Sequence, residues 1–150
     1  MTKSLALLFL VLTSLNAHAI TWKVFGACSD KPVFQGTYDA DLAKSAGHLT
    51  IEILEKNKIP YQGVPQGINS INNSAVDDAA IEVVSDKEMR VYGWCFAVNG
   101  KIPPAMADKV QLEDQSDTLV WFYAYSTNLE NQWVDMCNPA YWVKSKQFCK

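Results

Sequence analysis

Near the middle of the chain, one segment reads Arg90-Val-Tyr-Gly-Trp-Cys-Phe-Ala-Val-Asn-Gly100. Its alternation predicts a strand, because successive side chains of a strand point to opposite faces, and Asn99-Gly100 predicts a tight turn after it. One face is bulky and the other small: Tyr92, Trp94, Phe96 and Val98 against Val91, Gly93, Cys95 and Ala97. We expect the bulky face to line a core and another segment to lie close against the small face.

Cys95 stands on that small face, where it is well placed to tether another segment. The chain has four cysteines, Cys28, Cys95, Cys137 and Cys149. An even number in an exported protein predicts two disulfides, and four cysteines allow three pairings, which the residues alone leave open. Zinc is disfavoured because no pair has C-x-x-C spacing and His48 is the only histidine after residue 19.

The first 19 residues predict a secretory signal peptide. A basic start at Lys3 precedes an apolar run from Leu5 to Leu15 and an Ala-x-Ala site ending at Ala19. The apolar run is about half of the roughly 20 residues that a membrane-spanning helix needs. We therefore expect cleavage after Ala19 and a soluble protein, periplasmic or extracellular, without membrane insertion.

The size and charge of the chain predict a single acidic domain and argue against binding to nucleic acid or to an anionic membrane. Residues 20–150 form a chain of ordinary single-domain length and hold 12 basic and 16 acidic residues, a net charge of about −4. Arg90 is the only arginine. An acidic chain without a clustered basic face is a poor match for nucleic acid or for an anionic membrane.

Periodicity predicts strands at 20–25 and 33–36, joined as a hairpin. Apolar residues at helical spacing then predict one helix that begins at Asp39 or Ser45 and ends before Pro60. Its apolar stripe needs a partner surface, most simply a sheet.

The remaining segments predict loops, strands and a tail. Residues 61–68 are rich in Gly and Pro and predict a loop with little regular structure, followed by a surface loop at 69–78. Short strands are expected at 81–84 and 110–112. Residues 119–125 are apolar throughout, as in a central strand covered on both faces.

The pattern of these segments resembles the transcobalamin C-terminal-like domain, known in bacteria mostly as a domain of unknown function. The residues that carry the resemblance are Gly93-Trp94, Val98-Asn-Gly100, Val110–Leu112, Glu113–Asp117 and Val120–Tyr123. It covers residues 20–125 and leaves 126–150 as a tail with cysteines and aromatic residues. The resemblance implies an α+β fold, a β-grasp-like mixed sheet with one packed helix and a disulfide-tethered tail.

In a β-grasp fold the first and last strands lie side by side and parallel. The resemblance therefore implies that Cys28 pairs with Cys137 or Cys149, and that Cys95 pairs with the other tail cysteine. The alternative is a local Cys137–Cys149 loop with Cys28 bound to Cys95. The resemblance also implies cobalamin as a candidate ligand, although residues 20–150 contain no helical partner domain and the residues themselves indicate no cofactor.

Residues with catalytic chemistry are sparse in the sequence. His48 falls within the predicted helix, and no serine stands in a Gly-x-Ser-x-Gly elbow. The neighbouring carboxylates at 77–78 and 113–114 are typical of solvated loops, with weak calcium binding as the second interpretation. We therefore assign no catalytic residues, and a hydrolytic enzyme is the most distant alternative.

Four aromatic residues outside the predicted core strands are candidate binding residues: Tyr61, Trp133, Tyr141 and Trp142. They either cover one sheet face as a satellite core or form a surface for a ligand or partner, where aromatic anchors are favoured. The sequence thus predicts a secreted, non-catalytic module that binds a protein partner in the envelope or outside the cell. A small-ligand protein of the corrinoid-binding type is the alternative.

Overall fold

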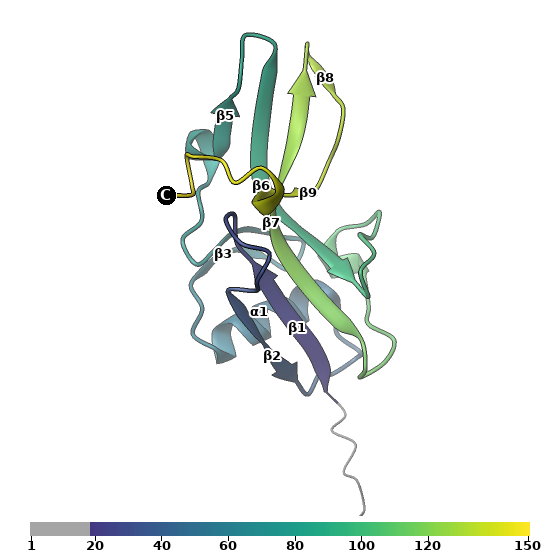
Figure 1. The fold of residues 1–150 in the computed structure, drawn as a ribbon. Coiled ribbons are helices and arrows are strands. Elements are labelled where there is room, and N and C mark those ends of the chain that lie inside the picture. The colour runs from purple at the N-terminus through teal and green to yellow at the C-terminus, as the bar shows by residue number, and fades with distance from the viewer. Residues whose placement is uncertain (1–18) are drawn as a thin grey trace, which may run out of the picture.

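The computed structural model describes residues 19–150, so the predicted signal peptide lies outside the described residues. The fold is a mixed α+β arrangement of strands with one α-helix (Figure 1). The helix is α1 (Ala46–Lys56), and three short 3₁₀ turns are η1 (Asp77–Ala80), η2 (Ala107–Lys109) and η3 (Ala140–Trp142). The strands are β1 (Ile20–Phe25), β2 (Phe34–Tyr38), β3 (Tyr61–Val64), β4 (Gly67–Ile71), β5 (Ile81–Val83), β6 (Glu88–Val98), β7 (Thr118–Leu129), β8 (Gln132–Trp133) and β9 (Asn138–Pro139).

The main sheet has the strand order β2-β1-β7-β6-β5, and β8 and β9 also pair with β7. The β1 strand runs parallel to the first part of β7, whereas β6 runs antiparallel to it along nearly its full length. A separate two-stranded sheet contains β3 and β4. The predicted α+β class with one helix is confirmed, and so is the expected parallel contact between the first and last long strands.

The helix begins at the later of its two predicted starts. Ser45 is the N-cap, and its hydroxyl accepts a hydrogen bond from the backbone N–H of His48. Leu49 and Ile53 are buried in a core that also contains Trp121 of β7. The Trp121 indole donates to the Thr50 hydroxyl at 2.7 Å, which satisfies a buried polar group between helix and sheet.

The two faces of β6 differ as the sequence predicts. On the bulky face, Phe96 stacks on Trp121 with ring centroids 5.2 Å apart, in the core under the helix. On the small face, Cys95 and Ala97 pack with Phe122 and with Cys137 of the tail. A tail segment therefore lies against the small face, as expected.

The structure corrects two of the predicted loops and strands. Residues 61–71, predicted as a Gly/Pro loop and the start of a surface loop, form the β3–β4 hairpin, with a bulge at Gln62/Gly63. Residues 110–112, predicted as a strand, form only an isolated bridge between Gln111 and Ser45. Their apolar side chains pack instead on the edge of the helical core, where Leu112 is buried.

The last long strand also differs from its predicted extent. The β7 strand continues beyond residue 125 to Leu129, because β6 supplies a pairing partner as far as Glu88. After Leu129 the tail turns back on the same sheet, where β8 and β9 pair with β7. No helix among residues 19–150 has the length and apolarity needed to span a membrane.

Two disulfides hold the tail, and both reach back to the body of the domain. Cys28 joins Cys149, and Cys95 joins Cys137. This is the arrangement implied by the resemblance to a β-grasp domain, with each tail cysteine bridged to the body. Loops of this length contribute about 3–5 kcal/mol per bridge in the chain-entropy description.

Gly47 of α1 lies against the backbone of Pro65, in the turn between β3 and β4, so a substitution there tests how this contact affects stability. A Cβ at Gly47 would lie 1.8 Å from the Pro65 carbonyl oxygen, so Gly47→Ala forces two backbone segments apart. We expect a loss of about 1–3 kcal/mol in the free energy of unfolding by urea denaturation. Gly67→Ala is the control, since its Cβ meets no atom within 4 Å, and an equal loss in both variants would contradict the explanation.

Candidate functional site

The sheet extends well beyond the part covered by the helix, as Figure 1 shows for β5, β8 and the adjoining ends of β6 and β7. Residues paired directly across strands point to the same face of a sheet. Val91 pairs with Ile81 on one side and with Ser126 on the other, and Asn128 pairs with Met89 and Trp133. The surface that results, here called the open face, consists of Ile81, Val83, Met89, Val91, Gly93, Ser126, Asn128 and Trp133.

The open face carries no charged residue, and several of its apolar side chains are exposed. Val83 is 75% exposed and Trp133 is 55% exposed, although both belong to strands of the main sheet. Met136, from the segment that follows β8, is 74% exposed beside them. Large apolar side chains left exposed on one face of a folded domain are typical of an interaction site.

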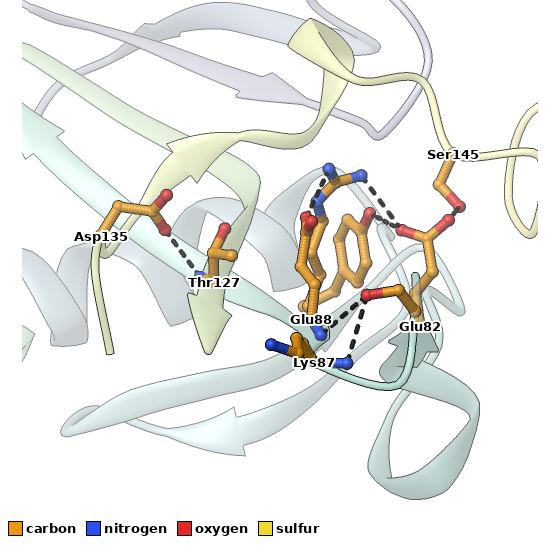
Figure 2. A network of polar contacts seen from close by, with 9 residues as sticks. Glu82, Lys87, Glu88, Thr127, Asp135 and Ser145 are labelled. Atoms are coloured by element: carbon orange, nitrogen blue, oxygen red, sulfur yellow. Dashed lines mark hydrogen bonds and ion pairs between the residues drawn. The ribbon is translucent and has the colours of Figure 1, made fainter. Parts of the chain in front are cut away.

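The charged residues of the same strands lie on the opposite face, where the end of the tail covers them. Glu82 accepts hydrogen bonds from the Ser145 hydroxyl at 2.6 Å and from the Tyr92 hydroxyl at 2.5 Å (Figure 2). Arg90 lies 3.6 Å from Glu82 and donates to Glu88 at 2.9 Å. This polar network places Ser145 of the tail against β5 and β6.

The network favours the ionised form of its central carboxylate. Burial opposes ionisation of Glu82, but hydrogen bonds from Ser145 and Tyr92 and the charge of Arg90 outweigh it and lower the pKa of Glu82. Burial and the hydrogen bond to Glu82 raise the pKa of Tyr92 to about 12, so Tyr92 stays a neutral donor. The outer part of the sheet thus has one face on which the tail covers both the Glu82 network and an aromatic cluster, and one apolar face that is left uncovered.

A groove of about 370 Å³ lies in the open face, between the sheet and the segment after β8. Gly93 and Cys95 lie along the sheet side of the groove, and Trp133, Met136 and Cys137 border it from the other side. A Cβ placed on Gly93 would meet no atom within 4 Å, so there is free space above this part of the strand.

The groove wall is fixed rather than loose. The Cys95–Cys137 disulfide closes one end of the segment. The Asp135 carboxylate accepts from the backbone N–H of Thr127 at 2.7 Å (Figure 2), and the N–H of Val134 donates to the Thr127 carbonyl at 3.0 Å. Because these bonds order the segment before any ligand arrives, little entropy remains to be lost on binding.

The four aromatic residues singled out by the sequence are not brought together. Trp133 lines the groove, whereas Trp142 is 65% exposed in η3 and is not among the residues lining that groove. Tyr141 packs against Phe25, with ring centroids 6.1 Å apart, and the Tyr61 hydroxyl donates to Glu55 at 2.9 Å. Gly93 was not predicted as a site residue, although a glycine in the middle of an apolar strand often marks the close approach of a ligand or of another backbone segment.

A cavity of about 610 Å³ lies elsewhere, beside the first turn of α1. Ser45 and His48 line it, and the Ser45 hydroxyl is 2.8 Å from Nδ1 of His48. This contact belongs to the helix cap, in which the same hydroxyl accepts from the His48 backbone. Glu52 is paired with Lys44, whose hydrogen bond lowers the pKa of Glu52 despite partial burial, so this carboxylate is a weak base.

Comparisons with known proteins do not identify a function for this surface. Within residues 19–150, no three His, Cys, Asp or Glu side chains are grouped so that they could hold a metal ion. No family model and no curated protein matches the chain. A crystal structure described as a "putative metal binding protein" from Ruminococcus gnavus is similar at a TM-score of 0.44 and 20% identity, over 70% of this chain and 94% of that one, a level that carries no functional argument.

The Glu82 network predicts a pH-dependent stability. Because the pKa of Glu82 is lower in the folded chain than its ordinary value of 4.5, its contribution is complete above that pH and is lost as the pH falls through the folded value. We expect Glu82→Gln to lower the free energy of unfolding by about 1–2 kcal/mol at pH 7 and to weaken the loss of stability between neutral and acidic pH. Urea denaturation at a series of pH values measures both.

The matched control is Glu130→Gln, which removes the exposed ion pair with Lys87. An exposed pair of this kind contributes little, so this variant is expected to follow the parent protein at every pH. Parallel pH profiles for the parent and the Glu82→Gln variant would contradict the assigned role of Glu82.

Proposed function

We propose that this chain is a secreted, non-catalytic binding module that holds a protein partner on its open face. The two disulfides support an oxidising compartment outside the cytoplasm, where such bridges persist. The parallel β1–β7 pair with α1 packed beside it supports a β-grasp-like classification of the fold. The partner inserts an apolar side chain into the groove beside Trp133.

Gly93 is the observation that carries this proposal. A glycine in a strand interior costs about 0.5–1 kcal/mol relative to alanine, and here no neighbouring atom requires it, since the space above it is empty. A larger residue would fit and would stabilise the strand, but it would fill the groove. The empty space is therefore explained by an external group that occupies it.

The extent of the open face favours a protein over a small ligand. A small molecule in the groove would cover Gly93 and Trp133 but would leave Val83 of β5 uncovered, although it is 75% exposed. A partner that fills the groove with one side chain and rests on β5 covers both. A corrinoid is the alternative occupant, but a groove of about 370 Å³ suits a single aromatic ring better than a macrocycle.

The test uses N-acetyl-tryptophanamide as a model of the inserted side chain, followed by amide chemical shifts. We expect the probe to shift the Gly93 amide with a dissociation constant on the order of millimolar. Gly93→Leu is expected to abolish this binding and also to stabilise the domain by about 0.5–1 kcal/mol. A structural explanation of Gly93 predicts the opposite, namely loss of stability with unchanged binding.

Two tryptophan variants give the matched comparison. Trp133→Ala is expected to weaken probe binding about tenfold, because the aromatic wall is lost, whereas Trp142→Ala, equally exposed but outside the groove, leaves it unchanged. Equal effects of the two substitutions would overturn the assignment of the groove.

The partner itself is tested with photo-crosslinking residues at positions 83 and 133 in the protein expressed in its own host. One polypeptide crosslinked from both positions, and lost in the Gly93→Leu variant, is the expected result. A small adduct in native mass spectrometry of the purified oxidised protein, without a crosslinked polypeptide, would support the small-ligand alternative instead.

A further inference from the structure

A further cavity, of about 490 Å³ and separate from the one beside α1, lies on the opposite side of the sheet from the groove. Its walls come from the end of β1 and the loop after it, from the loop after β4, and from the last residues of the tail. The lining residues, here called the neutral pocket, are Val24, Gly26, Ala27, Cys28, Val33, Ile71, Asn72, Asn73, Ser74, Ala75, Trp94, Tyr123 and Phe148. None of them carries a charge.

Three aromatic rings form one side of the neutral pocket. Trp94 and Tyr123 lie 5.4 Å apart between ring centroids, and Phe148 meets Tyr123 edge-on at 5.6 Å. Their polar ends are already used: the Trp94 indole donates to the Ser74 hydroxyl at 2.8 Å, and the Tyr123 hydroxyl donates to the Ala75 carbonyl at 3.0 Å. Tyr123 is only 2% exposed and backs the other two rings, so the apolar surface offered to the pocket comes from the partly exposed Trp94 and Phe148.

Two side-chain amides form the polar side. Asn72 and Asn73 have φ values of 53° and 58°, and the N–H of Ser74 closes the turn on the Ile71 carbonyl at 3.2 Å. Consecutive left-handed residues define a type I′ turn, a conformation that asparagine tolerates. Both side chains are exposed at the pocket, and neither makes a hydrogen bond to another residue of the described chain.

The pocket is held in shape without a ligand. The Cys28–Cys149 disulfide joins the loop after β1 to the tail end, and Phe148 also packs edge-on against Tyr92 at 4.7 Å. The loop after β1 and the end of the tail are thus joined by a disulfide, and the loop after β4 is held by the hydrogen bonds from Trp94 and Tyr123. A preformed cavity of this size and mixed character falls within the range of small-molecule sites.

We infer that the neutral pocket binds an uncharged saccharide. A sugar ring presents C–H groups on its faces, which suit apolar aromatic surfaces, and hydroxyl or acetamido groups around its edge, which suit the free amides of Asn72 and Asn73. A charged ligand would lose its hydration without meeting an opposite charge in the pocket. This site rests on different residues and a different sheet face from the proposed partner surface, so either can fail without the other.

The probe is N-acetylglucosamine, which carries hydroxyls and a neutral acetamido group. We expect it to shift the Trp94 indole N–H and the side-chain amide signals of Asn72 and Asn73 in a chemical-shift titration, with a dissociation constant on the order of millimolar. Glucosamine, which is cationic, and N-acetylneuraminic acid, which is anionic, are expected to bind at least tenfold more weakly. Equal binding of the charged sugars, or no shift at Trp94 with the neutral one, would overturn the inference.

The deciding variant replaces Asn72 and Asn73 with glycine, because glycine keeps the left-handed turn while it removes both amides. Loss of two hydrogen bonds predicts a rise of about tenfold or more in the dissociation constant. Asn131→Gly is the matched control, an exposed asparagine with φ 66° outside the pocket. Unchanged affinity in the double variant, or an equal rise in the control, contradicts the inference. If the double variant is unstable, the single Asn73→Gly variant is measured in its place, with a smaller rise in the dissociation constant expected.

Discussion

The mismatch in length between one helix and two strands shapes the rest of the structure. The 11 residues of α1 span roughly 16 Å, whereas the 12 residues of β7 span roughly 40 Å. The helix therefore covers less than half of the β6–β7 pair. The part of the sheet that the helix does not cover is packed instead against the chain after Leu129. The Cys95–Cys137 and Cys28–Cys149 disulfides hold this tail in place.

The tail covers the two faces of this outer sheet unequally. Its last residues lie on the charged face, where Ser145 binds Glu82 and Phe148 packs on Tyr92. Its first residues only border the other face through Trp133 and Met136. The covered face also carries an aromatic cluster around Tyr92 and Tyr123, so the tail buries apolar surface there as well as the Glu82 network. The feature that favours a partner on the open face is the apolar surface left exposed on it, above all at Val83 and Trp133.

The sequence predicted features that depend on local pattern. The alternation around Cys95 identified both faces of β6, and Ser45 was among the two predicted helix starts because an N-cap serine has a recognisable position. The β3–β4 hairpin was missed because its Gly and Pro residues are typical of a loop, whereas here they lie at the bulge and at the turn of a hairpin. The open face was missed for a different reason. Alternation separates Val83 from Glu82 but does not say which face the tail, some 60 residues later, will cover.

Gly93 and Trp94 are neighbours in β6, yet they belong to the two candidate sites. Alternation sends Gly93 to the groove and Trp94 to the neutral pocket on the other side. Both sites also need the tail, since Cys137 borders one and Phe148 the other. The disulfides therefore do more than stabilise a small domain. Each bridge fixes one wall of one site, so that reduction of a single bridge would loosen the site on its own face while β6 keeps the other in register.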